Sequence, residues 1–206
     1  FRELWNIGAG LPIDAIAKNT IQELDHSMYR DLEMEAARRV TVAMEHNRSI
    51  ELIKFRNDKF LNVKAIEEEK ETECKLSGAE LKDAGTVIVS KQFEYMGYKE
   101  VSNLDMSNNE IGAKGLDAIV HMLKQNAQTE DGRRYTNWSI SADSLEVLNL
   151  ANNQLEDLKP LVDVLDVKNV TLTRLVLWGN PGCADEDIKQ QLKVWWEKKH
   201  MGESMD

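Results

Sequence analysis

The stretch VSNLDMSNNEI, residues 101–111, arranges apolar residues and one asparagine in the frame L-x-x-L-x-L-x-x-N-x-L. The same frame recurs as LEVLNLANNQL at 145–155 and, as far as its asparagine, as LTRLVLWGN at 172–180. Alternating apolar residues predict a short strand whose inner side chains face a core, and the asparagine amide after it can bond neighbouring backbone. Three copies in register predict stacked units instead of a single closed core.

Weaker copies of the frame precede these three. Residues 50–60, IELIKFRNDKF, place Asp58 where the asparagine is expected. Residues 21–26, IQELDH, place His26 at the third inward position. The match therefore decays toward the N-terminus, although the spacing of these two copies still fits units that return by a helix.

Two steps between the units are too long for one repeat each. Val101 and Leu145 are 44 residues apart, whereas Leu145 and Leu172 are 27 apart. We therefore expect an insertion near residues 126–143, which are polar and lack periodicity, and a second one near residues 61–75.

Between the frames the apolar period lengthens from two to nearly four, which is typical of helices. Ser77 and Glu80 match a capping box, which predicts a helix beginning after Ser77. Strands joined by helical crossovers run parallel, so we expect strands on a concave side and helices on a convex side. The residues predicted to share helical faces are Leu32, Ala36, Val40 and Met44; Leu81, Ala84 and Ile88; and Leu116, Ile119, Val120 and Leu123.

Residues 101–126 resemble the ribonuclease-inhibitor type of leucine-rich repeat. The likeness is carried by Leu104, Asp105, Met106, Ser107, Asn109, Ile111, Gly112 and Gly115. The resemblance extends over about residues 21–183 and is sharp from Val101 onward. It implies an α/β leucine-rich repeat solenoid that binds other proteins, in which the two glycines serve the turn between strand and helix. Residues 31–55 are also similar to a helix-strand unit of the tropomodulin branch.

The chain is predicted to form one leucine-rich repeat domain over residues 1–206. Residues 1–20 would cap the first repeat, residues 21–183 would hold the repeats with their insertions, and residues 184–206 would form a C-terminal capping helix. Adjacent residues of a helix point about 100° apart, so only one of Trp195 and Trp196 can face the repeats.

The composition restricts the classes of partner and the compartments that we expect for this protein. The formal net charge of −10 disfavours nucleic acid, which needs a basic surface. No apolar run approaches the roughly 20 residues that a membrane helix needs. Cys74 and Cys183 are far apart in the repeat frame, so we expect free thiols in a reducing intracellular compartment, with no distinction between cytoplasm, cilium and mitochondrion.

The histidines, cysteines and glycines form no catalytic, metal-binding or nucleotide-binding motif. We therefore expect neither enzymatic activity nor a cofactor, and nothing indicates a homo-oligomer. The sequence favours a non-catalytic protein-protein interaction module, a scaffold subunit of a larger assembly with other protein subunits as partners. The alternative is a regulator: a GTPase activator resembling the Ran GTPase-activating proteins, or a tropomodulin-like actin-capping protein. The rim positions Asn108, Asn152 and Gly179 carry no arginine for the former role.

Partner-binding residues are expected on the strand face, in the insertion and on the terminal helix. The strand face should also present Ser107 and Ala151, because they continue its alternation. Aromatic residues and arginine are favoured at protein interfaces. The candidates are Trp178, Arg174, Asp105 and Asn149 on the strand face; Arg133, Arg134, Tyr135 and Trp138 in the insertion; and Trp196 on the terminal helix.

Overall fold

A computed structural model of the protein describes residues 10–29, 32–96, 101–126, 145–165 and 172–200. Short strands alternate with helices along most of this chain. In order, the elements are α1 (Ile13–Ala17), β1 (Glu23–Asp25), a 3₁₀ turn (His26–Met28), α2 (Met34–Met44), β2 (Leu52–Lys54), β3 (Phe60–Leu61), α3 (Val63–Glu67), β4 (Glu73–Lys75), α4 (Lys82–Met96), β5 (Asn103–Asp105), α5 (Ala113–Asn126), β6 (Val147–Asn149), α6 (Lys159–Leu165), β7 (Arg174–Val176), a second 3₁₀ turn (Pro181–Ala184) and α7 (Glu186–His200).

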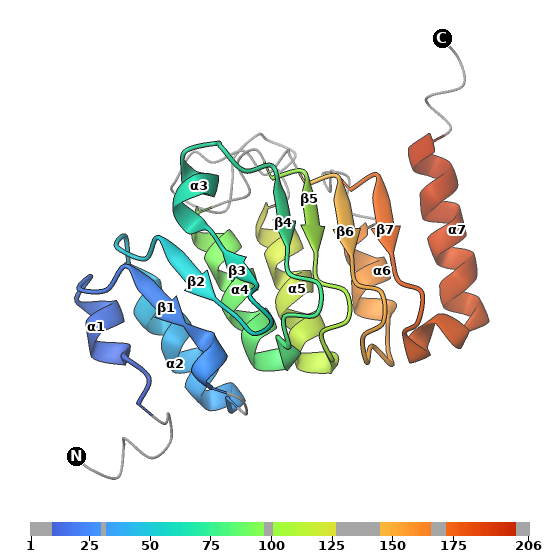
Figure 1. The fold of residues 1–206 in the computed structure, drawn as a ribbon. Coiled ribbons are helices and arrows are strands. Elements are labelled where there is room, and N and C mark those ends of the chain that lie inside the picture. Colours follow the sequence, from blue (N-terminus) through green and yellow to red (C-terminus); the bar gives the residue numbers. More distant parts are fainter. Residues whose placement is uncertain (1–9, 30–31, 97–100, 127–144, 166–171, 201–206) are drawn as a thin grey trace.

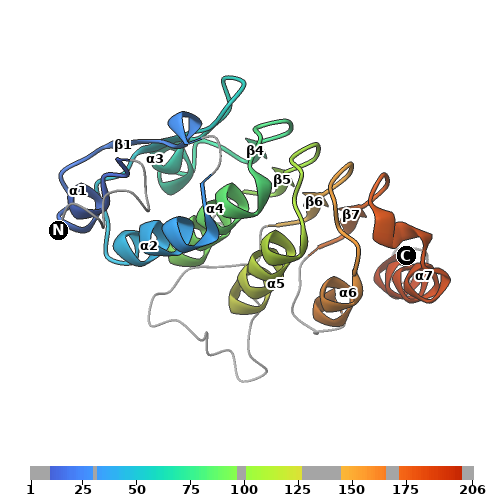
Figure 2. The same cartoon turned by 90° about the horizontal axis from the view of Figure 1, so that it is seen from below.

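The strands form two sheets that lie side by side in one layer. The first has the order β1-β2-β3, and the second, entirely parallel, has the order β4-β5-β6-β7. Helices α2, α4, α5 and α6 cover one face of this layer and leave the other face free of helices (Figures 1 and 2). The architecture is therefore α/β with parallel strands, as the sequence predicts.

The inner positions of the frame are buried, which confirms the predicted alternation. Leu104 and Leu148 lie in register on adjacent strands with no exposed surface. On the last strand, β7, Leu175 is only partly buried. The other buried frame residues are Leu24, Ile50, Ile53, Phe55, Val101, Met106, Ile111, Leu145, Leu150, Leu155, Leu172 and Leu177.

Residues 61–75 contain more than an insertion. Cys74 and Leu76 are buried at inner positions, and β4 pairs in parallel with β5, so this segment ends in a further repeat strand. The sequence obscures it, because Ala79 stands where the asparagine is expected. The rest of the segment holds the end of β3, α3 and the turn that leads into β4, and it links the two sheets. The insertion expected near 126–143 lies, beyond the end of α5, outside the described residues.

The β2 unit departs from the frame at Asp58. The backbone of Asn57 and Asp58 is left-handed, and the Phe55 N–H donates to the Lys59 carbonyl across a tight turn. The chain then returns as β3, antiparallel to β2, and the Phe60 side chain is 50% exposed. A hairpin therefore replaces the turn into a helix that the other units make.

Helix α4 begins later than its capping-box pattern predicts. It starts at Lys82, while Ser77 lies in the turn before it and shares a hydrogen bond with the Ser107 hydroxyl. Thr86 and Ser90 are buried along with the apolar residues, because α2 and α5 flank α4 on both sides. The predicted apolar faces of α2, α4 and α5 are otherwise buried as expected, apart from a half-buried Leu32 before α2.

Helix α7 stands beside β7 at the end of the strand row (Figure 1). The Asp185 carboxylate accepts the backbone N–H groups of Asp187 and Ile188, which begins the helix. Trp195 is buried, whereas Trp196 is 53% exposed and stacks on His200. The expectation that only one of the two tryptophans is covered is confirmed. None of the described helices is long and apolar enough to cross a bilayer.

Candidate interaction surface

Three buried asparagines tie the strands β4 to β7 together. The Asn153 carboxamide oxygen accepts the N–H groups of Asn109 and Ile111 from the preceding unit, at 3.0 and 3.1 Å. Each asparagine amide also donates to carbonyls of its own unit and of the preceding one. Those carbonyls belong to Leu76 and Ser107 for Asn109, to Met106, Leu150 and Ala151 for Asn153, and to Leu150 and Leu177 for Asn180. Buried amides bonded in this way hold neighbouring strands in a fixed register.

The residue before the frame asparagine has a left-handed backbone in every unit from β2 to β7. That position holds only glycine or asparagine, the residues that adopt this conformation at least cost: Asn57, Gly78, Asn108, Asn152 and Gly179. The side-chain amides of Asn57, Asn108 and Asn152 make hydrogen bonds within the molecule. They donate to the Gly78 carbonyl, the Ser77 hydroxyl and the Asn108 carboxamide oxygen, respectively. The rim after the strands is therefore a bonded polar row.

The helix-free face of the strands, called here the open strand face, is mixed in charge. Strand register aligns its residues in rows, Glu73, Asn103, Val147 and Arg174 in one and Lys75, Asp105, Asn149 and Val176 in the next. All of these side chains are exposed or half-buried. On the first sheet, Glu23, Asp25, Leu52, Lys54 and Phe60 continue the face.

The end of this face at β6 and β7 combines apolar groups with one cation. Arg174, Val176 and Trp178 follow one another at alternate positions, and Val147 lies in register beside Arg174. The Trp178 side chain is 63% exposed. We call Val147, Arg174, Val176 and Trp178 the β7 patch. It is the candidate site, because exposed aromatic residues beside an arginine are typical of protein interfaces.

Asp105 and Asn149 lie on the open strand face, but their side chains accept hydrogen bonds from the turns that follow their strands. The Asp105 carboxylate accepts the Ser107 N–H at 3.0 Å and its hydroxyl at 2.7 Å, and the Asn149 carboxamide oxygen accepts the Ala151 N–H at 3.1 Å. Both side chains therefore shape the turn that follows their strand. Ser107 and Ala151 are buried, so the prediction that they are presented on this face is wrong.

Of the remaining candidates, Trp196 alone lies in the part of the chain that the structure describes. Arg133, Arg134, Tyr135 and Trp138 lie outside the described residues. Trp196 belongs to α7, where its ring lies 4.4 Å from the His200 ring, measured between centroids. The sequence therefore predicts several separate contacts, of which the structure places Arg174 on β7 and Trp178 in the turn directly after it.

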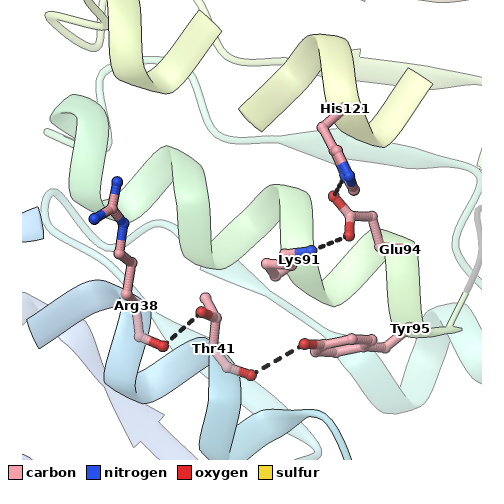
Figure 3. A network of polar contacts seen from close by, with 6 residues as sticks. All are labelled: Arg38, Thr41, Lys91, Glu94, Tyr95 and His121. Atoms are coloured by element: carbon pink, nitrogen blue, oxygen red, sulfur yellow. Dashed lines mark hydrogen bonds and ion pairs between the residues drawn. The ribbon is translucent and has the colours of Figure 1, made fainter. Parts of the chain in front are cut away.

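Sequence reasoning missed a polar network in the helix layer. Glu94 on α4 is nearly buried, pairs with Lys91, and bonds His121 on α5 at 2.8 Å (Figure 3). Tyr95 donates to the Thr41 carbonyl on α2 at 3.2 Å. Burial and the nearby Glu45 and Glu94 carboxylates raise the pKa of Tyr95 to about 12. The network links three neighbouring helices, and a charged residue near the end of an otherwise buried helix is its sequence signal.

The glycine pair at the start of α5 has a different role from the one expected. Neither Gly112 nor Gly115 needs a left-handed backbone. Asp83 of α4 instead accepts both of their N–H groups, at 2.7 and 2.9 Å. A Cβ on Gly115 would lie 2.5 Å from Ile111 and 2.8 Å from the Asp83 carboxylate, so this glycine permits close approach of two helices.

Burial shifts the pKa of one histidine and of both cysteines among the described residues. His26 is buried, its Nε2 has no hydrogen-bond partner, and its pKa is lowered to about 4 by desolvation and by Arg56. Burial also raises the pKa of the free thiols Cys74 and Cys183. Within the described part of the chain, no group of three or more His, Cys, Asp or Glu side chains is placed to hold a metal ion.

Comparison with known proteins supports the repeat. The leucine rich repeat family model matches residues 144–163, which contain β6 and the start of α6. No match was found among curated proteins. The solved structure of leiomodin-1 actin-binding site 2 aligns with 93% of this chain and 89% of its own, at 15% identity and a TM-score of 0.43. Strand register, asparagine bonding and the family match together support a leucine-rich repeat protein.

Proposed function

We propose that this protein is a non-catalytic protein-protein interaction module, a scaffold subunit of a larger assembly. Its repeats would form a leucine-rich repeat solenoid of the ribonuclease-inhibitor type. The β7 patch would be the main contact, with other protein subunits as partners. The free thiols Cys74 and Cys183 support a reducing compartment.

The observation that carries the proposal is the exposure of Trp178 on a strand face that no helix covers. Aromatic rings of this size contribute strongly when they are buried at an interface. The asparagine bonds hold β5, β6 and β7 in fixed register, so the patch is arranged before a partner arrives. A pre-formed surface of this kind suits binding.

The GTPase-activator form of the regulator alternative has no observation in its favour among the described residues. At the rim positions where a GTPase activator would present charged groups, Asn108 and Asn152 bond to each other. Gly179 has no side chain, and a Cβ there would collide with the Asn152 amide. We therefore do not propose a GTPase-activating role; a tropomodulin-like actin-capping role is the second candidate function, based on the likeness of residues 31–55 to that branch.

Co-purification with matched variants tests the proposal. Tagged wild-type protein, Trp178→Ala and Val42→Ala would be expressed in the same cells, and captured proteins would be quantified by mass spectrometry. Val42 is a suitable control because it is exposed to a similar extent but lies on α2, away from the open strand face. We expect Trp178→Ala to lose stoichiometric partners that Val42→Ala retains.

Thermal unfolding of the same variants separates binding from folding. Because Trp178 is mostly exposed, Trp178→Ala should change the free energy of unfolding by no more than about 0.5 kcal/mol. Equal partner recovery by Trp178→Ala and wild type would exclude the β7 patch as the main contact. A large loss of stability would assign Trp178 to the core.

A further inference from the structure

Arg174 is the unpaired cation of the open strand face. Within the described residues this face carries Lys54, Lys75 and Arg174 as its cations. Lys54 pairs with Glu23 at 2.5 Å and Lys75 with Glu73 at 2.6 Å, whereas Arg174 has no ion pair or side-chain hydrogen bond with any residue that the structure describes. The guanidinium is therefore free to pair with a group from outside the molecule.

Apolar side chains lie next to this cation and further along the same end of the sheet. Val147 lies beside Arg174 across the strands, Val176 follows it on the same side of β7, and Trp178 lies in the turn two residues beyond the end of β7. Both valines are half-buried and Trp178 is mostly exposed. An arginine next to low-polarity surface pairs more strongly with a carboxylate than one in open water does, because the apolar groups exclude water from the pair.

We infer that the β7 patch binds an extended acidic-apolar segment of a partner protein, one that carries an aspartate or glutamate close to a large apolar side chain. The carboxylate pairs with Arg174 in a two-pronged geometry, and the apolar side chain packs on Trp178, Val176 and Val147. This inference rests on the proposed function and adds the chemistry of the partner. Charge complementarity selects an acidic segment, because the partner must supply the anion that the protein itself does not.

The acidic character of the whole chain does not oppose this contact. Glu73 lies in the same row as Arg174 but three strands away, which is about 14 Å at the usual strand spacing. At physiological ionic strength, charges separated by more than about 8 Å are largely screened. Glu146, next to Val147 in sequence, is exposed and makes no ion pair with Arg174. Arg174 therefore sets the local charge of the β7 patch.

Selection from a phage-displayed library of random peptides tests the inference on the whole 206-residue chain. Enriched peptides would be synthesised with a dye, and their affinity measured by fluorescence anisotropy for wild type, Arg174→Glu, Trp178→Ala and Lys75→Glu. Lys75→Glu is the matched control, because it reverses a cation on the same face that already has a partner. We expect peptides with an acidic residue near Leu, Ile, Phe or Trp.

Arg174→Glu and Trp178→Ala should each weaken these peptides by about tenfold or more, and Lys75→Glu should not. Added salt should weaken wild-type binding and have less effect on Arg174→Glu. Arg174 and Trp178 are exposed, so unchanged thermal unfolding would show that each variant is folded.

Three results would overturn the inference. The first is enrichment of basic or uncharged peptides, and the second is failure to enrich any peptide whose binding depends on Arg174. The third is concentration-dependent self-association of the wild type, seen by sedimentation and lost in Arg174→Glu, which would make a second copy of this chain the occupant.

The two proposals fail in distinguishable ways. If Trp178→Ala abolishes binding while Arg174→Glu does not, the partner chemistry is wrong and the proposed function stands. If neither variant affects peptide binding, and Trp178→Ala also retains its partners in co-purification, the β7 patch itself is excluded.

Discussion

The second sheet keeps the repeat frame more strictly than the first. In β5, β6 and β7 the frame asparagine is present and buried as Asn109, Asn153 and Asn180. In β2 the same position holds Asp58, which is exposed, and the chain forms a hairpin there. A carboxylate has no N–H to donate to the carbonyls that the asparagine amide satisfies, so it cannot replace the amide inside the turn.

The boundary between the two sheets also lies at a unit that lacks the frame asparagine. Each frame asparagine bonds its own unit and the unit before it, so a missing asparagine leaves the preceding unit without these amide hydrogen bonds. Ala79 of the β4 unit lacks an amide, and the two sheets separate between β3 and β4. At the rim the units remain linked through the Asn57 amide, which donates to the Gly78 carbonyl at 2.6 Å, and through the Arg56–Glu80 ion pair.

The largest expected effect comes from exchanging the two residues that distinguish the sheets. Asn153→Asp keeps the shape of the side chain but removes its donors and places a carboxylate against buried carbonyls. We expect the free energy of unfolding to fall by about 3 kcal/mol or more, measured by urea denaturation. Asp58→Asn, at the equivalent exposed position, should change it by less than about 0.5 kcal/mol. Similar effects at both positions would contradict the role given to the asparagines.

The second prediction concerns His26, which replaces an apolar residue in the first sheet. Its pKa is about 4 in the folded protein, against 6.5 in the unfolded chain. Below pH 6.5 the unfolded chain therefore binds a proton that the folded protein does not, and stability falls until about pH 4. One pKa unit corresponds to about 1.4 kcal/mol, so the loss attributable to this residue reaches about 3 kcal/mol.

Unfolding curves between pH 7 and pH 4 check this prediction. His26→Leu should remove that part of the pH dependence, because a leucine at this inward position does not titrate. His46→Leu, which changes an exposed histidine, should retain the wild-type profile. Parallel curves for His26→Leu and wild type would mean that His26 does not control acid stability.

The smallest of the three effects tests the helix layer beside the second sheet. Gly115→Ala introduces a methyl group too close to Ile111 and Asp83, so we expect a loss of about 1–3 kcal/mol in the free energy of unfolding. In Gly112→Ala the new Cβ would lie 3.4 Å from the Asp83 carboxylate, an ordinary contact, so that variant should stay close to wild type. Thermal melting of both variants measures the difference. Equal melting temperatures would show that the helices move apart easily.

Much of the second sheet could be predicted from the sequence because most of its units keep the repeat frame strictly. Leu104, Leu148 and Leu177 are buried where the frame places them, and the amphipathic faces of α2 and α5 are buried as expected. The β4 unit was missed because Cys74 and Ala79 replace the residues that mark a repeat. The Gly115 role could not be predicted because it depends on Asp83, which lies on another helix.

The candidate site was likewise predictable from the sequence only in part. The strand alternation alone predicts that Arg174 and Trp178 share a face, because a strand has a period of two. Whether a residue on that face is available to a partner depends on its neighbours in space. Asp105 and Asn149 have hydrogen bonds to the turns that follow them, and Ser107, two positions further along the same alternation, is buried.

The sequence by itself determined that strands and helices alternate, which residues face the core, and where asparagine amides are required, because these follow from local spacing. Only the tertiary structure decided that the strands divide into two sheets, that Asp83 binds the start of α5, and that Arg174 lacks a partner while Lys54 and Lys75 have one. Hydrogen bonds and ion pairs between units depend on distances across the stack, and those distances are set by packing, which no single repeat encodes.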